Sequence, residues 1–325
     1  RAFTVDNIEI MGKTNAQNYR NKYLQVAFKK GFEKLIISII REKDQKELLS
    51  TNAQIIKTFI LSYKIIEEKI IDNDYKLKVA VVFNRKLVEK FLQEKNISYS
   101  EEKKLDMLVY PILILDSNLH VFSKNKFFEE WNRHEDSQNI SFILPIENLD
   151  DIDFIKKNLL TLEESNLSRL VDNYEIKNST IVILRYDKKQ LNAFLKINLS
   201  GINKVKKIDF VLENYENAEA RGDIILNLKN YINEVWKEEN LIDISTPSYL
   251  TVNTKITDMT SIKKIIDKIK GISLIETYSV EKIDNESAKI KIKFFGKIKN
   301  LQERFRENGF RFEILHNEWN LYLNT

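Results

Sequence analysis

The chain has 325 residues, a length that predicts two or three domains rather than a single core. Apolar residues make up 43% of it and charged residues 31%, a balance typical of folded rather than disordered proteins. The 52 lysines and arginines nearly balance the 48 aspartates and glutamates, which argues against a dedicated nucleic-acid-binding protein. The absence of cysteine excludes disulfides, thiolate metal sites and cysteine nucleophiles.

The first predicted module covers residues 1–98 and has the order β-α-α-β-β-α, which is ferredoxin-like (split βαβ) in outline. Alternating apolar residues indicate its strands, and apolar residues at helical spacing indicate its helices. Its expected elements are a strand at 3–10, a helix at 15–41, a short helix after the polar stretch 41–52, strands at 59–71 and 75–83, and a helix at 84–96.

The middle module is expected at residues 105–240, after the polar segment 96–104. It opens with the unbroken apolar stretch "MLVYPILIL", which is typical of a strand buried on both faces. Helices and strands then alternate, which predicts an α/β sandwich. The other expected elements are a helix at 127–131, a strand at 140–146, helices at 151–157 and 161–173, strands at 179–187, 190–199 and 205–212, and a helix at 217–239.

The last module is expected at residues 241–325 and has the order β-α-β-β-α-β, again the ferredoxin-like arrangement. Two strands are expected after its second helix. Its elements are strands at 249–256, 272–283 and 287–295, helices at 258–270 and 297–308, and the closing strands at 310–315 and 319–323. The predicted fold class is therefore mixed α+β and α/β, in three modules.

A basic stretch in the last module supplies the candidate binding residues. Lys289, Lys291 and Lys293 alternate with apolar residues, so they share one face of a strand while Phe294 is expected to point inward with the isoleucines. We expect a solvated face that also protects a sheet edge, because lysine discourages edge-to-edge pairing. The alternatives are a docking surface for an acidic partner or an anionic membrane, and a nucleic-acid-binding sheet.

Three carboxylates supply the candidate metal ligands. Asp150, Asp151 and Asp153 are close enough in sequence to hold Mg²⁺ or Ca²⁺, and a metal-dependent enzyme in the middle module is the corresponding alternative function. They also suit the positive N-terminus of the helix expected there, and their spacing does not match an EF-hand. The helix-terminus interpretation is the one we favour.

Two short motifs are explained by local structure. "MGKT" follows a strand, but a phosphate-binding loop needs a first glycine five residues before Gly12, where the sequence has Asn7. Thr14 and Gln17 instead have the spacing of a helix capping box.

Arg221–Asp223 form an adhesion tripeptide by composition, but they fall at a helix start, so we treat the match as chance. His134, beside Glu135 and Asp136, is expected to be solvated.

Several phrases along the chain occur in an order that is characteristic of one bacterial family. They include "NAQNYRNKYLQVAFKKGFEKLI", "YKLKVAVVFNRKLVEKFLQEKNI", "ISFILPIENLDDID" and "AKIKIKFFGKIKNLQERFRENGF". In this order they resemble domain-of-unknown-function family 2066, and the middle module resembles the amino-terminal domain of TolB. The resemblance implies an exported, periplasmic protein whose signal peptide was removed before Arg1. The family has no established activity, so it implies no catalytic residues and no cofactor.

The leading hypothesis is a non-enzymatic, periplasmic envelope protein that acts in protein–protein interaction or assembly. Its expected partners are other envelope proteins, with no nucleic acid, and a homo-oligomeric or peripheral membrane contact is left open. No apolar run approaches the roughly 20 residues that a transmembrane helix needs, so we expect no membrane span within these residues.

Overall fold

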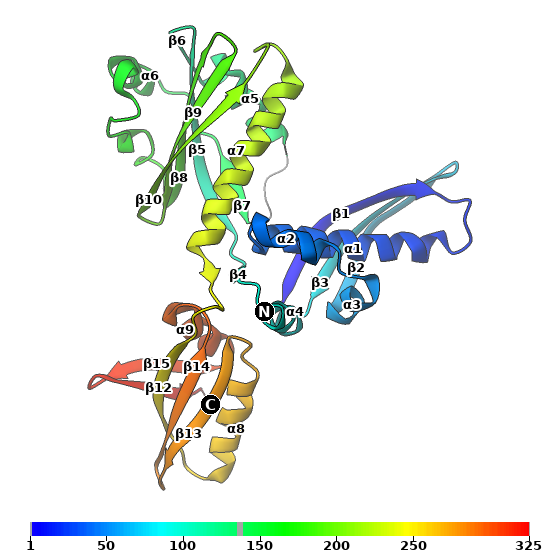
Figure 1. The fold of residues 1–325 in the computed structure, drawn as a ribbon, viewed down its shortest axis with the longest axis vertical. Coiled ribbons are helices and arrows are strands. Elements are labelled where there is room, and N and C mark those ends of the chain that lie inside the picture. Colours follow the sequence, from blue (N-terminus) through cyan, green and yellow to red (C-terminus); the bar gives the residue numbers. More distant parts are fainter. Residues whose placement is uncertain (1, 135–138, 325) are drawn as a thin grey trace. The chain divides into compact units, whose positions relative to one another are not determined.

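The computed structural model describes residues 2–134 and 139–324 and shows a mixed α+β protein (Figure 1). Helices and sheets recur along the whole chain, which confirms the predicted fold class. Glu135 and Asp136, which the sequence places beside His134, lie outside the described residues.

The chain divides into two compact units. Unit 1 comprises residues 1–101 and 237–325, and unit 2 comprises residues 102–236. The predicted first and last modules therefore share one unit, and the middle module is inserted between them. Where the chain leaves unit 1 and returns to it, the short strands β4 (Tyr99–Ser100) and β11 (Leu241–Ile242) pair antiparallel.

The first segment of unit 1 is built on a three-stranded sheet in the order β1-β3-β2, with β3 antiparallel to both neighbours. The insertion of β3 between β1 and β2 is the split βαβ arrangement that the sequence predicts. The elements of this segment are β1 (Phe3–Lys13), α1 (Tyr19–Ile39), α2 (Glu42–Leu49), α3 (Ala53–Phe59), β2 (Ile60–Ile71), β3 (Asp74–Phe83) and α4 (Arg85–Glu94).

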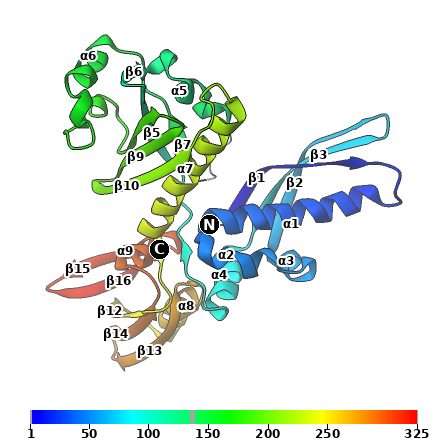
Figure 2. The same cartoon turned by 45° about the horizontal axis from the view of Figure 1, so that its top comes forward.

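Helix α1 covers one face of this sheet (Figure 2). Phe28, Phe32 and Leu35 are buried on it at helical spacing, opposite the buried alternate residues of β3. Helix α2 forms in the stretch that the sequence predicts as a polar break. Glu42 and Asp44 in its first turn favour it through the helix dipole, and Leu48 anchors it to the core.

The capping box predicted at Thr14 is wrong, because α1 begins only at Tyr19. The Thr14 amide donates instead to the Asn73 carbonyl at 3.0 Å, in the turn between β2 and β3. A Cβ atom on Gly12 would overlap the ring of Tyr23, so this glycine allows the helix to approach the strand. The segment is thus the paired end of a strand and not a phosphate-binding loop.

The second segment of unit 1 has a five-stranded sheet in the order β13-β14-β12-β16-β15. The first split βαβ unit is present, since β14 separates β12 from β13. After α9 the hairpin of β15 and β16 departs from a ferredoxin-like sheet: β16 lies parallel to β12, and β15 forms the edge. The elements are β12 (Ser248–Lys255), α8 (Met259–Lys270), β13 (Ile275–Ile283), β14 (Ser287–Phe294), α9 (Ile298–Glu307), β15 (Phe310–Leu315) and β16 (Glu318–Leu323).

Unit 2 has a twisted mixed sheet in the order β10-β9-β8-β5-β6, with β7 also beside β5. Helices α5 and α7 pack on one face, and α6 with its following turns packs on the other. Strand β5 is buried on both faces, as its apolar run predicts. The elements are β5 (Leu105–Leu115), β6 (Asn118–Val121), α5 (Lys126–Glu130), β7 (Ile140–Ile143), α6 (Leu149–Lys157), β8 (Asn178–Asp187), β9 (Gln190–Leu199), β10 (Ile202–Val211) and α7 (Ala218–Glu239).

The helix predicted at residues 161–173 does not form. The segment contains only short 3₁₀ turns at Leu159–Thr161 and Ser168–Leu170. Side chains there bond the local backbone: the Ser165 hydroxyl donates to the Thr161 carbonyl at 2.6 Å, and the Asn166 side chain accepts from the Ser168 amide at 3.0 Å. Such bonds compete with helical ones. Within the described part of the chain, no helix is long and apolar enough to cross a bilayer.

Candidate functional site

The three candidate lysines lie on the open face of the second sheet of unit 1. Lys289, Lys291 and Lys293 project from β14 on the side opposite its buried isoleucines, and Phe294 is buried, as predicted. Strand β14 is central, however, with β13 and β12 on its two sides. These lysines therefore cannot protect a sheet edge, because their strand has no unpaired edge.

This open face mixes both signs of charge with an aromatic ring. Lys293 pairs with Glu276 of β13 at 2.9 Å, and this hydrogen bond raises the pKa of Lys293. Lys291 lies 5.1 Å from the ring centroid of Tyr249, whose side chain is 61% exposed. Because Tyr249 is in the neighbouring strand β12, the pattern of β14 alone does not reveal this pair. The arrangement suits one stacked ring, but the acids dilute its positive field.

We expect the protein to pass unretained through a heparin column at about 0.15 M salt, because dense phosphate or sulfate binding needs an excess of unpaired cations. The matched control is the double variant Lys289→Glu/Lys291→Glu, which should elute at the same salt concentration. Strong retention of the parent protein that is lost in this variant would contradict the expectation and favour the nucleic-acid alternative.

The three aspartates are arranged at the first turn of α6 and around it. The side chain of Asn148 accepts a hydrogen bond from the Asp150 amide at 2.8 Å and so caps the helix. Asp151 is buried and accepts from the Tyr110 hydroxyl at 2.8 Å, whereas Asp150 and Asp153 are exposed. Within residues 2–134 and 139–324, no three histidine, cysteine or acidic side chains are grouped to hold a metal ion. The geometry favours the helix-terminus interpretation.

The first two residues of the adhesion-like tripeptide are buried in unit 2. Arg221 is buried and forms a bidentate ion pair with Glu130 of α5, with N–O distances of 2.9 and 2.5 Å. This ion pair lowers the pKa of Glu130. A Cβ atom on Gly222 would lie 2.7 Å from the imidazole of His134, which packs over the glycine. His134 is thus partly buried rather than solvated, and the tripeptide is not a recognition loop.

A pocket of about 500 Å³ lies in unit 2 between the turns after α6 and the ends of β8, β9 and β10. Its lining includes Ser165, Ser168, Asp172 and Lys196. Burial lowers the pKa of Lys196, and Glu163 partly opposes this shift. The Lys196 ammonium donates to the Ser165 carbonyl at 2.6 Å, so it serves to hold the turn.

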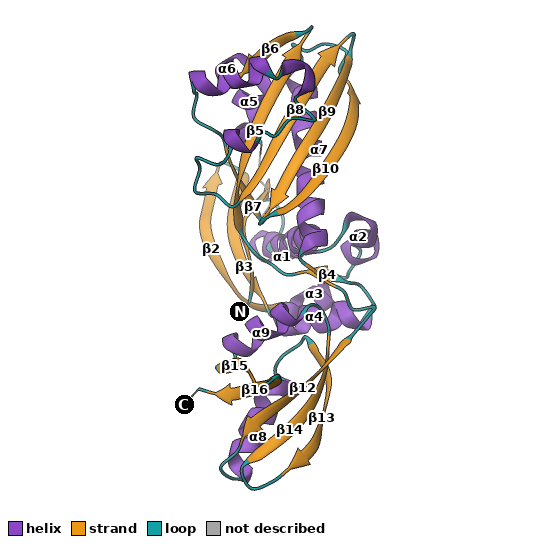
Figure 3. Ribbon diagram, turned by 90° about the vertical axis from the view of Figure 1, so that its left-hand side faces the viewer, coloured by secondary structure: helices purple, strands orange, loops and turns teal. Residues whose placement is uncertain are grey.

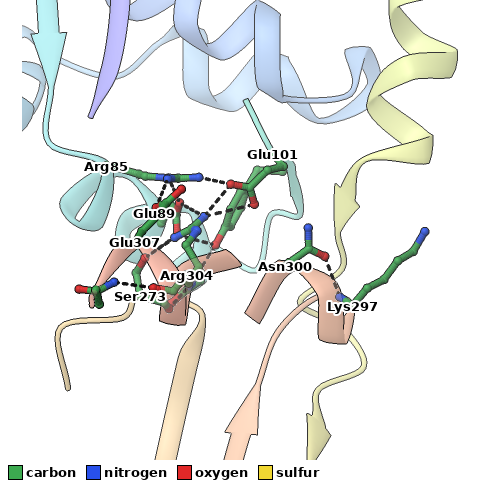
Figure 4. Close-up of polar contacts among 11 residues, drawn as sticks. Arg85, Glu89, Glu101, Ser273, Lys297, Asn300, Arg304 and Glu307 are labelled. Carbon is green, nitrogen blue, oxygen red and sulfur yellow. Dashed lines mark hydrogen bonds and ion pairs between the residues drawn. The ribbon is translucent and has the colours of Figure 1, made fainter. Parts of the chain in front are cut away.

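A buried network of charged side chains connects the two segments of unit 1 (Figure 4). Glu89 of α4 is fully buried and pairs with Arg85 at 2.9 Å and with Arg304 of α9 at 2.7 Å. Glu101 pairs with both arginines, at 3.2 Å for Arg304. The hydroxyl of Ser273 also donates to Glu89, at 2.5 Å. Two buried arginines thus balance two buried glutamates, which is the condition under which such charges are tolerated.

Electrostatics inside this network stabilise the ionised forms. Complete burial acts to raise the pKa of Glu89, but Arg304 and Arg85 outweigh it and hold that pKa below its usual value. Burial acts to lower the pKa of Arg304, but Glu89 and Glu101 outweigh it and raise that pKa. Burial raises the pKa of Tyr99, whose hydroxyl donates to Glu89 at 3.2 Å. The ion pairs join α4 of the first segment to α9 of the second, so the network holds the two segments together.

A sequence signal for the network exists in the helix faces. Arg85 and Glu89 are spaced with the buried Val88 and Leu92 on one side of α4, so two charged residues share an apolar face. Arg304 occupies the same kind of position on α9. A charged residue on a buried face predicts an oppositely charged neighbour, but not which residue supplies it.

Acid should weaken unit 1 through Glu89. Because the folded state lowers this pKa, the carboxylate contributes stability above the unfolded value of about 4.5, and the contribution is lost as pH falls through the folded value. Glu89→Gln should therefore lower the melting temperature at pH 7 and show a smaller further drop between pH 5 and pH 3. Melting curves of the two proteins that fall in parallel with pH would contradict this assignment.

Strand β2 is the least covered element of unit 1. Within the described chain, β3 is the one strand bonded to it, so its other edge is unpaired (Figure 3). Most of its twelve residues are exposed, including Ile66 at 52% and Ile71 at 68%. Its exposed large apolar residues are Leu61, Tyr63, Ile65, Ile66, Ile70 and Ile71. A long, apolar edge strand is a template for pairing with another strand.

The edge strands β10 and β13 lack this concentration of exposed apolar residues. In unit 2, the edge strand β10 has three exposed large apolar side chains, Ile202, Val205 and Val211, whereas β2 has six. In unit 1, the edge strand β13 includes Glu276, Glu281 and only a few exposed apolar side chains. The concentration of apolar residues on β2 is therefore specific to this edge.

Comparison with known protein families finds no matching family model, and a search of curated proteins finds no match.

Proposed function

We propose that this chain is a non-enzymatic interaction or assembly component that binds another protein along strand β2. The exposure of six large apolar side chains on one edge strand carries the proposal. Exposed apolar surface is costly in an isolated protein and marks interaction sites. An added strand would use the unpaired backbone groups for affinity and the apolar side chains for specificity.

The proposal includes export to the periplasm, and the ordered phrases that resemble family 2066 support that part. Its expected partners are then other envelope proteins. Fractionation of cells that express the full-length protein tests the location: the protein should be released with the periplasmic fraction. Recovery in the cytosolic fraction alone would overturn the export proposal and leave the β2 proposal standing.

Photocrosslinking in intact cells tests binding along β2. A photoreactive amino acid in place of Ile65 should produce covalent adducts with a protein chain, because this residue lies in the middle of the strand. The matched control replaces Leu160 of unit 2, which is 91% exposed but lies in a turn without an unpaired strand edge. Adducts that are equally frequent at both positions, or absent at both, would contradict the proposal.

A further inference from the structure

We propose that the strand bound by β2 is β2 of a second copy of this chain, paired antiparallel about a two-fold axis. This inference rests on the proposed function and adds the identity of the partner. Such an interface is isologous: if residue i contacts residue j of the partner, then residue j contacts residue i of the partner. Strand β2 must then be complementary to itself, in shape and in charge.

The pairing of β2 with β3 shows which face each side chain occupies. Lys64 is opposite Ala80 and Glu67 is opposite Lys78, on the open face of the sheet. Tyr63 is opposite the buried Val81, on the face that α1 covers. Between Ile65 and Glu67 the register shifts by one residue. Because of this bulge, residues on its two sides share a face when they are an odd number of positions apart.

The bulge determines which two-fold registers are allowed. Directly opposite residues in an antiparallel pair must lie on the same face. Across the bulge, two residues satisfy this condition when their numbers differ by an odd count. The two-fold axis must then pass between two consecutive residues. In the register centred on the bulge, it passes between Ile65 and Ile66. In this register Lys64 is opposite the partner's Glu67, and Tyr63 is opposite the partner's Glu68, which shares its face.

Charge favours this register over the next one along the strand. The central register forms two Lys64–Glu67 pairs, one on each side of the axis, and opposite charges that face each other stabilise paired strands. Moving the partner by two residues would place Lys64 against the partner's Lys69, which is repulsive. Within one chain Glu67 already pairs with Lys69 at 2.6 Å, and its second carboxylate oxygen can accept from the partner's Lys64.

The absence of cysteine from the chain makes disulfide mapping direct. An equimolar mixture of the Lys64→Cys and Glu67→Cys variants should form a disulfide-linked dimer under mild oxidation, because directly opposite residues lie within bonding range. Lys64→Cys alone should not, since its counterpart is then about 10 Å away along the strand. Equal cross-linking of Lys64→Cys with itself would overturn the register.

Charge exchange tests the two-fold relation in the otherwise unmodified protein. Lys64→Glu should weaken dimerisation about tenfold in analytical ultracentrifugation, and the variant Lys64→Glu/Glu67→Lys should recover the parent affinity. Melting temperatures serve as the folding control. A parent protein that stays monomeric at about 100 μM, above the roughly micromolar affinity of moderate interfaces, overturns the proposal. If β2 then still cross-links to a different protein in cells, only the self-pairing fails, and the proposed function stands.

Discussion

Replacing Arg304 with alanine is expected to destabilise unit 1 by about 3–5 kcal/mol, the cost of leaving a buried charge without its partner. Arg304 is buried and contacts both Glu89 and Glu101, so the variant leaves two buried carboxylates with Arg85 alone. Urea unfolding measures the loss, and hydrogen exchange should locate it in α4 and α9. This is the largest single-residue effect that we expect in unit 1.

Arg306→Ala is the matched control, because Arg306 is on the same helix but exposed. Its effect should stay within about 0.5 kcal/mol, as for most surface substitutions. A second comparison is the double variant Glu89→Leu/Arg304→Leu, which should cost less than the sum of the single changes because it removes one charge of each sign and leaves Arg85 paired with Glu101. Equal losses in Arg304→Ala and Arg306→Ala would show that the network contributes little.

Arg221→Ala is expected to destabilise unit 2 by about 3 kcal/mol, because Glu130 would stay buried without its cation. The value is at the lower end of the range for buried pairs, since this is one bidentate pair and not a network. Arg221 also donates to the Tyr215 carbonyl, and that bond is lost in the variant. Hydrogen exchange in α5 and in the first turns of α7 should report the loss.

Asp223→Ala changes the exposed third residue of the same tripeptide and is the control. Its expected effect is within about 0.5 kcal/mol. The two variants separate the explanations of Arg221–Asp223: a recognition motif would make both residues matter for binding, whereas a core ion pair makes only Arg221 matter for stability. A small loss of stability in Arg221→Ala would contradict the structural assignment.

Local patterns in the sequence predict most strands and long helices. The apolar run of β5 indicates burial on both faces, and the alternation in β14 correctly separates Phe294 from the lysines. These features can be read from the sequence because side-chain direction depends on a residue's own backbone conformation. The same reasoning fails at residues 161–173, where several polar side chains bond the nearby backbone instead of allowing a helix.

Predictions that depend on neighbours far along the chain are less successful. The sequence shows that Lys289, Lys291 and Lys293 share a face, but not that β14 is a central strand. Thr14 has the spacing of a capping residue, yet it bonds Asn73 in a distant turn. In both cases the deciding contact joins residues that are remote in sequence, and a local pattern carries no information about it.

By itself, the sequence determined the type of most elements and the face that they bury, because these follow from the period of their apolar residues. Only the tertiary structure decided which elements are neighbours: that unit 2 is inserted into unit 1, that Glu89 meets Arg304, and that β2 is left at an edge. The physical reason is that pairing between distant segments depends on the packing of the whole unit. The candidate interface on β2 arises in this way, from a strand that the fold leaves unpaired.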